Sequence, residues 1–599
     1  MNQQLRHSQS HWSRDCVIYQ IYPRSFADST GNGSGDLVGI IEHLPYLAEL
    51  GVDGIWLSPV FVSPQVDGGY DVADYRHIDP LYGSDEDMDA LLKRAHELNL
   101  KVLLDIVPNH TSDKHQWFQE ALAASPNSPA RKRYWFVDSK YPNTPPNNWV
   151  SIFGGPAWTK VCNRPDATGQ VWADDNQYYL HIFDPGQPDL NWENPEVRKE
   201  FHDIFTYWLS RGVDGFRIDV AHGLVKAPGL PDFDSEAKMI DGSQSADPRF
   251  DQPGVHDIIR EWRSLIDPHD AMLVGEVWVP TSSLAHYLSP GEMQQVFAFD
   301  FLMSAWNAHD LRATINKFID FPASSGVPAW VLSNHDSVRH ASRFGLPTPN
   351  ARPNGIGVND PQPDRERGLH LAKGATLLML ALPGAAYLYQ GEELGLPDHL
   401  YLRDEQRQDP TFTNTGGSEL GRDGCRAPMP WRKEAPHFGF SDISEGETWL
   451  PQPDSYGELA ADQQVGRAGS IYEFYKKALK LRKERAFGLA TLSWVDKTTV
   501  TATHDSFSDL SNNHHWHEAK KTTQRANTQC VDHLDYILTS PYGTITRVIY
   551  PLGECSIAVP DGWRVLLASG PLHSCDSATV IPAGVCAYCA RYDDNNAGI

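Results

Sequence analysis

The sequence has no apolar run of the length that crosses a membrane. A spanning helix needs about 20 consecutive apolar residues, and the apolar runs here are interrupted much earlier by polar or charged residues. The N-terminal stretch MNQQLRHSQSHWSRD also has no apolar segment of the kind that forms the centre of a secretory signal peptide. We therefore expect a protein that neither spans a membrane nor follows the secretory route.

Cysteine is scarce and irregularly spaced. The chain has 8 cysteines in 599 residues, and their positions show no disulfide-scaffold rhythm, which predicts reduced thiols and a cytoplasmic location. One pair, Cys586 and Cys589, forms a C-x-x-C. It lies in the alternating stretch VCAYCARY, which predicts a strand with the two thiols on opposite faces. The sequence has no second such pair to complete a zinc site.

Positive charge is also in short supply. The chain carries 51 Lys and Arg against 77 Asp and Glu, a formal net charge of −26. Binding to nucleic acid needs a basic surface that neutralises phosphates, so we exclude nucleic acid as a partner. An acidic surface of this kind contributes to solubility and says little more about function.

The sequence does contain a repeated alternation of short apolar runs and helical patterns. In residues 85–98, for example, the apolar residues fall on one helical face, and Ser84 predicts the start of that helix. Eight such units in order predict an α/β fold, the (β/α)8 or TIM barrel. The predicted strands are 17–26, 54–60, 101–110, 215–221, 271–278, 296–301, 329–336 and 385–393.

Two stretches depart from the alternation. Residues 111–186 follow the third predicted strand, are rich in Pro, Asn, Trp and Asp and show no sustained helix, so we expect a small inserted domain. From about 490 onward, short Val- and Thr-rich runs predict an all-β end domain. Within it, 511–529 is expected to be an exposed loop, and its histidines are less favoured as metal ligands. The predicted domains are a barrel in two parts (1–110 and 187–490), the insert (111–186) and a β domain (491–599).

Several predicted barrel strands end in charged or strongly polar residues. The C-terminal strand ends of a barrel and the loops that follow them form its active site, and a buried charge without a partner is costly. One such residue could belong to a structural ion pair, but here four strands bring polar groups to one rim. The strand ends concerned are 108–110, 215–219, 275–276 and 334–336.

Three carboxylates and an arginine at one rim suggest cleavage of a glycosidic bond. In a retaining mechanism one carboxylate attacks the anomeric carbon, and a second carboxyl group, roughly 5–5.5 Å away, protonates the leaving oxygen. The acid needs a raised pKa, whereas the nucleophile must stay ionised. Arg217 shares a strand face with Asp219 and would keep it ionised, and Glu276, with apolar neighbours, is the better candidate for the acid.

The motifs DIVPNH, GFRIDV, GEVW and SNHD at these strand ends resemble those of the family 13 glycoside hydrolases, the α-amylase family, in sequence and order. The resemblance covers nearly the whole chain. It implies Asp219 as the nucleophile, Glu276 as the general acid and base, and Asp336 as a third carboxylate that binds ring hydroxyls and supports distortion of the sugar.

The same resemblance implies further contacts in the subsite where cleavage occurs. His110, Arg217 and His335 would touch the sugar there. The insert at 111–186 looks like the family's B domain, and the end segment looks like its β-sandwich C domain.

Within the family, the likeness is greatest to α-glucosidases and oligo-1,6-glucosidases. Asp67 and Tyr70 match their D-x-x-Y motif, in which the tyrosine stacks on the sugar and the aspartate binds its far hydroxyl. The stretch GRDGCRAPMPW matches one whose arginine, here Arg422, pairs with that aspartate. Such a pair would close one end of the pocket and admit a single terminal glucose, unless Arg422 forms a plain surface salt bridge.

The residue after the implied nucleophile is Val220. In this group valine at that position is usual in enzymes active on α-1,6 linkages, and threonine or alanine in those active on α-1,4 linkages. A β-branched apolar side chain would narrow the floor near the aglycone, which favours α-1,6 activity. One methyl group changes discrimination by only about 1–3 kcal/mol, so activity on both linkages stays open.

A glycine-rich loop near the N-terminus offers oxygen ligands at every second position. Related glucosidases have D-x-N-x-D-G-x-G-D there, so two substitutions in this chain would weaken the site. Glycosyl transfer needs no metal, and no cofactor is expected for the chemistry. The candidate ligands for a structural Ca²⁺, or Mg²⁺, are Asp28, Thr30, Asn32, Ser34 and Asp36.

The predicted function is an exo-acting retaining α-glucosidase that hydrolyses terminal α-linked glucose from disaccharides or short oligosaccharides by double displacement. Its expected partner is a small sugar such as maltose, isomaltose or a sucrose-like disaccharide. One alternative is a transglycosylase or isomerase of the same family that forms sucrose isomers or trehalose with the same carboxylates. A more remote alternative is a non-catalytic transporter-associated relative, which would lack the carboxylates and carry a membrane anchor.

Overall fold

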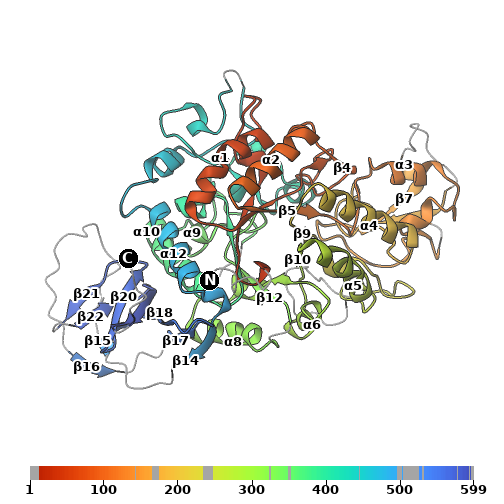
Figure 1. Cartoon of the computed structure of the whole chain (residues 1–599). Coiled ribbons are helices and arrows are strands. Elements are labelled where there is room, and N and C mark those ends of the chain that lie inside the picture. The colour runs from red at the N-terminus through yellow and green to blue at the C-terminus, as the bar shows by residue number, and fades with distance from the viewer. Residues whose placement is uncertain are drawn as a thin grey trace.

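Eight parallel strands close into a barrel at the centre of the molecule (Figure 1). Its order, β1-β2-β5-β9-β10-β11-β12-β13, follows the sequence, and all eight predicted strands are present, which confirms the predicted barrel. The strands are β1 (Val17–Ile21), β2 (Gly54–Leu57), β5 (Lys101–Ile106), β9 (Gly215–Ile218), β10 (Met272–Gly275), β11 (Gln295–Phe297), β12 (Val327–Val331) and β13 (Ala385–Tyr389). This computed structural model describes residues 12–141, 143–164, 175–233, 247–322, 325–348, 353–443, 446–495, 502–503, 525–528, 532–575, 578–592 and 594.

The barrel strands end earlier than the apolar runs of the sequence. The run 17–26 is a strand only to Ile21, and the run 296–301 turns after β11 into helix α7 (Phe299–Met303). The predicted ends are wrong because the segments that follow the strands are buried as well: Phe26 and Phe301 have no exposed surface. Burial of apolar residues therefore does not by itself show where the backbone hydrogen bonds between neighbouring strands end.

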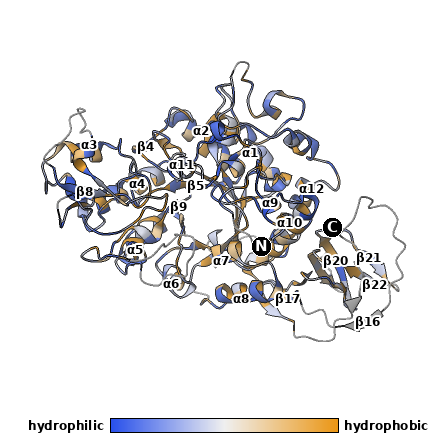
Figure 2. Cartoon of the chain, turned by 180° about the vertical axis from the view of Figure 1, so that it is seen from behind, coloured by the Kyte–Doolittle hydropathy of each residue, from blue (hydrophilic) through white to orange (hydrophobic). Residues whose placement is uncertain are grey.

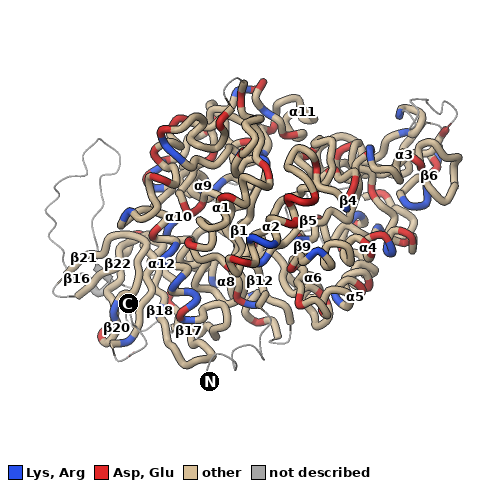
Figure 3. The backbone as a smooth tube through the Cα atoms, turned by 45° about the horizontal axis from the view of Figure 1, so that its top comes forward, with Lys and Arg blue, Asp and Glu red and all other residues tan. Residues whose placement is uncertain are grey.

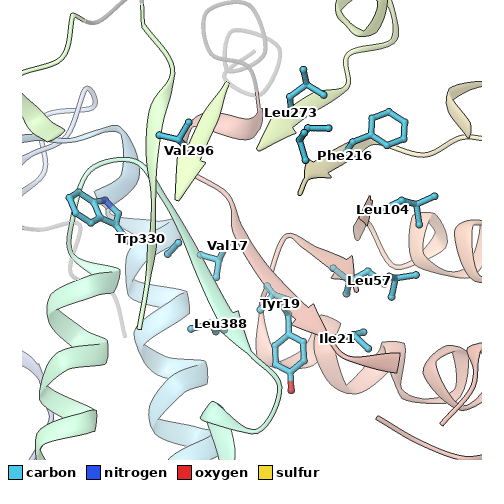
Figure 4. Close-up of a cluster of buried hydrophobic side chains, with 14 of the residues drawn as sticks. Val17, Tyr19, Ile21, Leu57, Leu104, Phe216, Leu273, Val296, Trp330 and Leu388 are labelled. Atoms are coloured by element: carbon cyan, nitrogen blue, oxygen red, sulfur yellow. The ribbon is translucent and has the colours of Figure 1, made fainter. Parts of the chain in front are cut away.

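Side chains of the barrel strands alternate between two apolar clusters, because successive strand residues point to opposite sides. Val17, Tyr19 and Ile21 of β1 belong to the large core between the barrel and its helices (Figure 4). Ile18 belongs to a second cluster with Trp56, and this cluster fills the barrel interior. The inward positions nearer the C-terminal strand ends are polar, and they carry the candidate site.

Helices surround the barrel. The predicted helix start at Ser84 is confirmed, because its side chain accepts from the Asp87 N–H in a capping box. Hydrophilic and hydrophobic residues lie side by side along the helices in Figure 2, as expected when one face of each is buried. The main helices are α1 (Leu37–Leu50), α2 (Asp85–Glu97), α4 (Pro195–Ser210), α5 (Val255–Ile266), α6 (Thr281–Tyr287), α8 (Ala308–Ile319), α9 (His340–Arg343), α10 (Arg365–Leu380) and α12 (Ile471–Glu484).

The segment after β5 forms its own small unit at one end of the molecule (Figure 1). It contains a three-stranded antiparallel sheet, in the order β6-β8-β7, and helix α3 (Gln116–Ala123). We expected no sustained helix in this segment, and it contains the eight-residue α3, whose residues Phe118 and Leu122 are buried four positions apart. The sheet strands are β6 (Phe136–Asp138), β7 (Trp158–Lys160) and β8 (Gln177–Leu180).

The C-terminal part is all-β, as predicted. Two five-stranded sheets have the orders β14-β17-β18-β23-β20 and β16-β15-β19-β22-β21. Of the predicted loop 511–529, residues 525–528 form a strand instead, and the others lie outside the described residues. The strands are β14 (Thr491–Trp494), β15 (Ala502–Thr503), β16 (Arg525–Thr528), β17 (His533–Thr539), β18 (Ile545–Pro551), β19 (Ser556–Ala558), β20 (Trp563–Ala568), β21 (His573–Cys575), β22 (Ala578–Ile581) and β23 (Ala587–Arg591).

The cysteines confirm one expectation and contradict another. Cys586 and Cys589 belong to two different apolar clusters, so the two thiols do lie on opposite faces of the sheet. Cys555, however, is disulfide-bonded, so the expectation of reduced thiols throughout is wrong. In the part of the chain that the structure describes, no helix is both long and apolar enough to span a membrane.

A buried carboxylate after β13 makes a pH-dependent prediction. Glu392 is 3% exposed, and its Oε2 has no hydrogen-bond partner among the described residues; burial raises its pKa to about 8. The folded chain therefore takes up a proton between the ordinary pKa of about 4.3 and about 8, and stability is lost as pH rises through that window. We expect Glu392→Gln to raise Tm by about 2–4 °C more at pH 8 than at pH 5. The exposed Glu366→Gln should show no such difference in a thermal melt.

Candidate active site

Arg217 lies at the centre of a buried group of carboxylates at the C-terminal rim of the barrel. Its inward direction follows from the alternation along β9. Nη1 donates to Asp105 Oδ1 at 3.0 Å and to Asp219 Oδ1, and Nη2 donates to Glu276 Oε2 at 2.8 Å. All four side chains are buried. One guanidinium thus connects carboxylates from three neighbouring strand ends by charge-assisted hydrogen bonds.

This group holds more carboxylates than one arginine neutralises. Burial raises the pKa of Asp219 well above its usual value and the Glu276 carboxylate raises it further, whereas Arg217 lowers it. Burial likewise raises the pKa of Asp105 to about 7, against the lowering by Arg217. Arg217 therefore acts on the pKa of Asp219 in the direction that the sequence suggested, against burial and the Glu276 carboxylate. A retaining mechanism needs one acid and one carboxylate, and Asp219 and Glu276 both contact Arg217 at this rim.

Glu276 is positioned by a strained neighbour. Val220 adopts φ 42° and ψ 44°, a left-handed conformation that costs a β-branched residue of order 1–3 kcal/mol. In that conformation its N–H donates to Glu276 Oε2 at 3.1 Å, while Trp278 Nε1 donates to Oε1 at 3.0 Å. The Val220 side chain is buried in one apolar cluster with Trp149 and Phe183 of the insert. Val220, the residue predicted to influence the preference between α-1,6 and α-1,4 linkages, thus lies between Glu276 and the insert.

The third predicted carboxylate, Asp336, is the most exposed of the three, with 33% of its side chain accessible. Its Oδ1 accepts from Arg422 Nη1 at 3.0 Å and from Arg426 Nη2 at 3.1 Å, and Oδ2 lies 3.0 Å from His335 Nε2 without hydrogen-bond geometry. Against burial, which raises it, the charges of His335, Arg422 and Arg426 hold the pKa of Asp336 well below its usual value. Burial lowers the pKa of His335, so near pH 7 the two arginines are the charges that keep Asp336 ionised.

Arg422 forms the predicted pair with Asp67. Its Nη2 donates to Asp67 Oδ1 at 2.7 Å, and Nε donates to Asp409 Oδ2 at 2.6 Å. With the bond to Asp336, the guanidinium connects three carboxylates. Only 14% of the arginine side chain and 6% of the Asp67 side chain are exposed, so the alternative of a plain surface salt bridge is wrong. Asp67 lies between β3 (Phe61–Val62) and β4 (Asp74–Ile78), far in sequence from Arg422.

The aromatic rings of Tyr70 and His335 are stacked on each other. Their ring centroids are 5.2 Å apart and the planes are 3° from parallel. The Tyr70 hydroxyl donates to Asp105 Oδ2 at 3.0 Å, and His335 Nδ1 lies 2.7 Å from Gln20 Nε2. These contacts with Asp105 and Gln20 hold both rings in position. Among the described residues, His335 Nε2 has no hydrogen-bond partner.

His110 joins the same site through a glutamine. Gln187 Nε2 lies 3.1 Å from His110 Nε2 and 3.3 Å from Asp67 Oδ2. Burial lowers the pKa of His110 to about 4, so the ring is neutral near pH 7. Contacts thus connect all ten predicted catalytic and substrate-binding residues.

The network also includes residues that are not among the predicted site residues, such as Asp105, Gln187, Asp409 and Arg426. Asp105 had a signal, because it is an acidic residue at an inward position of an apolar strand. Arg426 follows Arg422 by four residues in the same motif. Gln187 and Asp409 lie in irregular segments, where the sequence offers no periodicity from which to place them.

The glycine-rich loop lies apart from this network and fits a cation poorly. Asp28 accepts five hydrogen bonds, three from backbone N–H groups of the loop and one from the Thr30 hydroxyl. Asn32 Oδ1 accepts from Ser34 N at 2.8 Å, and Asp36 caps α1. Oxygen lone pairs that already accept N–H and O–H groups are not free to bind a metal. No group of three or more His, Cys, Asp or Glu placed to hold a metal occurs among the described residues.

This arrangement makes a prediction about divalent cations. We expect EDTA, or 5 mM Ca²⁺ after EDTA, to change Tm by less than about 2 °C, because a cation must first displace the hydrogen bonds to Asp28. A thermal melt measures this. A Ca²⁺-dependent rise of several degrees that is lost in Asp28→Asn would contradict the expectation.

Residues 20–489 match the family described as "Alpha amylase, catalytic domain". The chain belongs to the α-amylase family. Among its relatives, the trehalose-6-phosphate hydrolase of Escherichia coli (strain K12) is 36% identical over 81% of this chain and 85% of that protein. The probable α-glucosidase of Rhizobium meliloti (strain 1021) is 38% identical over 79% and 82%, and the oligo-1,6-glucosidase of Parageobacillus thermoglucosidasius is 35% identical over 79% and 84%.

Solved structures agree with this placement. The α-glucosyl transfer enzyme XgtA superposes with a TM-score of 0.79 at 33% identity, covering 97% of this chain and all of that one. The trehalulose synthase MutB of Pseudomonas mesoacidophila MX-45 has the same TM-score and coverage at 27% identity. This member of the α-amylase family is therefore a glycoside hydrolase, and its relatives include glucosidases.

Proposed function

We propose that this α-amylase-family enzyme is an exo-acting retaining α-glucosidase that releases terminal non-reducing glucose from disaccharides or short oligosaccharides. The observation that carries the proposal is the chain of contacts from the buried Asp67 through Arg422 to the partly exposed Asp336. We propose that these charged side chains close one end of the glucose subsite, so that a glucan chain cannot continue beyond one glucose. The printed names of the relatives support a glucosidase of this class.

In the proposed mechanism, Asp219 attacks the anomeric carbon and Glu276 protonates the leaving oxygen. Arg217 occupies Asp219 Oδ1, which leaves the second carboxylate oxygen for the attack. The glucosyl–enzyme ester is then hydrolysed by water, whose proton returns to Glu276. Because each step inverts the anomeric carbon, the product keeps the α configuration.

The other residues bind the glucose. Asp67 and Asp336, both held by Arg422, accept hydrogen bonds from ring hydroxyls on two sides. The Tyr70 ring offers an apolar face for stacking. His335, with its free Nε2, and the neutral His110 contact hydroxyls near the cleavage point. No cofactor takes part in these steps.

The decisive experiment follows the anomeric configuration of the first product by proton NMR. With isomaltose, maltose and an aryl α-glucoside, we expect α-glucose to form first and to mutarotate later. Longer maltooligosaccharides should lose one glucose at a time. First release of β-glucose would contradict retention, and internal cleavage products would contradict the exo action.

Val220 is the basis of a proposal about which glycosidic linkage the enzyme prefers. Its burial beside Glu276 is consistent with a narrowed floor near the leaving group, and we propose a preference for α-1,6 over α-1,4 linkages. Val220→Thr should lower the isomaltose-to-maltose ratio of kcat/KM about 5- to 10-fold, the effect of about 1 kcal/mol or slightly more. Val213→Thr, a buried valine before β9, serves as the control. An unaltered ratio in Val220→Thr would refute the linkage proposal.

A transglycosylase or isomerase remains the second candidate, because XgtA and MutB are named for such reactions. Product chromatograms from concentrated maltose and sucrose separate the two. Free glucose as the main product supports a hydrolase, whereas new disaccharides or longer oligosaccharides support transfer. The presence of all three carboxylates at the rim weighs against a non-catalytic relative.

The location of the protein stays a prediction. We propose that it acts in the cytoplasm on a small sugar and without nucleic acid or membrane as partner. The disulfide of Cys555 argues against one basis of that proposal, the reduced thiols.

A further inference from the structure

A second concave site lies between the barrel helices and the C-terminal sheet. It has a volume of about 570 Å³ and is bounded by α10, the start and middle of α12, and the end of β20 with the turn that follows it. These elements lie beside one another in Figure 1. None of the candidate catalytic or sugar-binding residues lines it. A cleft of this size matches sites that bind small molecules.

The cleft is basic, although the chain as a whole is strongly acidic. Positions three and four apart share a helix face, which brings Lys476, Lys477 and Lys480 of α12 to one side. Figure 3 draws the Lys and Arg positions of the chain in blue. Lys373 of α10 also lines the cleft, and Glu473 is the one acidic residue among the described lining residues. Glu473 already accepts from the Gly466 N–H at 2.8 Å.

Two of these lysines have no carboxylate partner in the part of the chain that the structure describes. Lys476 pairs with Glu49 at 2.7 Å, and Lys480 lies 3.7 Å from Glu484. Lys477 has no such contact, and Lys373 Nζ instead lies over the Phe474 ring, 4.9 Å from its centroid. Burial lowers the pKa of Lys373, so a bound anion would stabilise its charged form.

The remaining lining adds features suited to an organic anion. The half-buried Phe474 ring lies in the wall and offers a flat apolar face. The first N–H groups of α12 are not available, because Gln464 accepts from Ile471 N and Tyr472 N. The lysines therefore provide the anion recognition.

We propose that this cleft binds a phosphate-bearing small molecule, with Lys373 and Lys477 contacting the phosphate and Phe474 packing against the organic part. Ammonium groups without a carboxylate partner that line one cleft match a multiply charged oxyanion, which attracts each of them. A sugar phosphate and a nucleotide share this chemistry. The bound molecule would connect the barrel helices to the β domain, since it touches both.

The test uses the full-length chain and isothermal titration calorimetry with pyrophosphate at low ionic strength. We expect saturable binding that weakens at least about fivefold in Lys373→Gln/Lys477→Gln and stays within twofold in Lys93→Gln, an exposed lysine of α2. Asp219→Asn should bind pyrophosphate as the wild type does, because its site is separate. Hydrolysis of an aryl α-glucoside should be unchanged in the double lysine variant.

Two further titrations identify the source of the phosphate. Glucose 6-phosphate binding more tightly than AMP points to a sugar phosphate, and the reverse order points to a nucleotide; either result supports the site. Phe474→Leu should weaken the preferred organic ligand but leave pyrophosphate unaffected. Absence of pyrophosphate binding, or equal weakening in Lys93→Gln and the double variant, would overturn the proposal.

Discussion

Asp219→Asn is expected to lower kcat/KM for an aryl α-glucoside by at least about 10⁴-fold while the fold survives. The amide cannot form the glucosyl ester, so the first step of double displacement is lost rather than slowed. Because Asp219 is buried and shares the charge of Arg217 with Asp105 and Glu276, replacing one of three carboxylates leaves the arginine with partners. Tm should therefore stay within about 5 °C of the wild type, and circular dichroism should be unchanged. Retained activity would remove Asp219 as the nucleophile.

Azide rescue separates the roles of the two paired carboxylates. In Asp219→Ala, azide can enter the space of the nucleophile and attack once, which gives the β-glucosyl azide. In Glu276→Ala, Asp219 still attacks first, and azide then opens the ester to give the α-glucosyl azide. An aryl glucoside with a good leaving group makes both reactions measurable, because it needs little acid catalysis. If the two stereochemical outcomes were exchanged, the assignment of nucleophile and acid would be reversed.

The regular part of the site could be predicted from the sequence. Arg217 and Asp219 stand two residues apart on a strand, and the period of a strand sends both inward. Glu276 and Asp336 follow other barrel strands, so the shared rim of a parallel barrel brings them together. Local sequence patterns predict each strand and the side to which its residues point. All eight strands could therefore be predicted, although their ends could not.

The irregular part could not be placed in the same way. Arg422 reaches Asp67 across 355 residues, and only the resemblance to glucosidases implied that contact. Asp409, which fixes the arginine on its other side, lies in a segment with no periodicity. The strained φ of Val220 is equally invisible in the sequence, because valine normally avoids the left-handed region. Such features depend on the packing of distant segments rather than on local pattern.

The Asp67–Arg422 pair makes the second large prediction. Removing one partner of a buried charge pair costs about 2–5 kcal/mol, so Asp67→Ala should lower kcat/KM for an aryl α-glucoside about 30- to 5000-fold. Arg422→Ala should have an effect of similar size. Since the two share one interaction, the double variant should fall well short of the sum of the single effects. Glu261→Ala, which breaks the exposed pair with Arg198, is the control and should change kcat/KM less than twofold.

The two single variants should differ in which constant changes. Asp67 binds the far end of the glucose, away from the reacting bond, so its loss should act mainly on KM. Arg422 also holds Asp336 at 3.0 Å, so its loss frees a carboxylate placed beside the reacting ring and should lower kcat as well. Both variants should gain activity on longer chains relative to disaccharides, because the closed end is opened. If kcat and KM were unchanged in Asp67→Ala, the pair would be structural, and the exo action would need another cause.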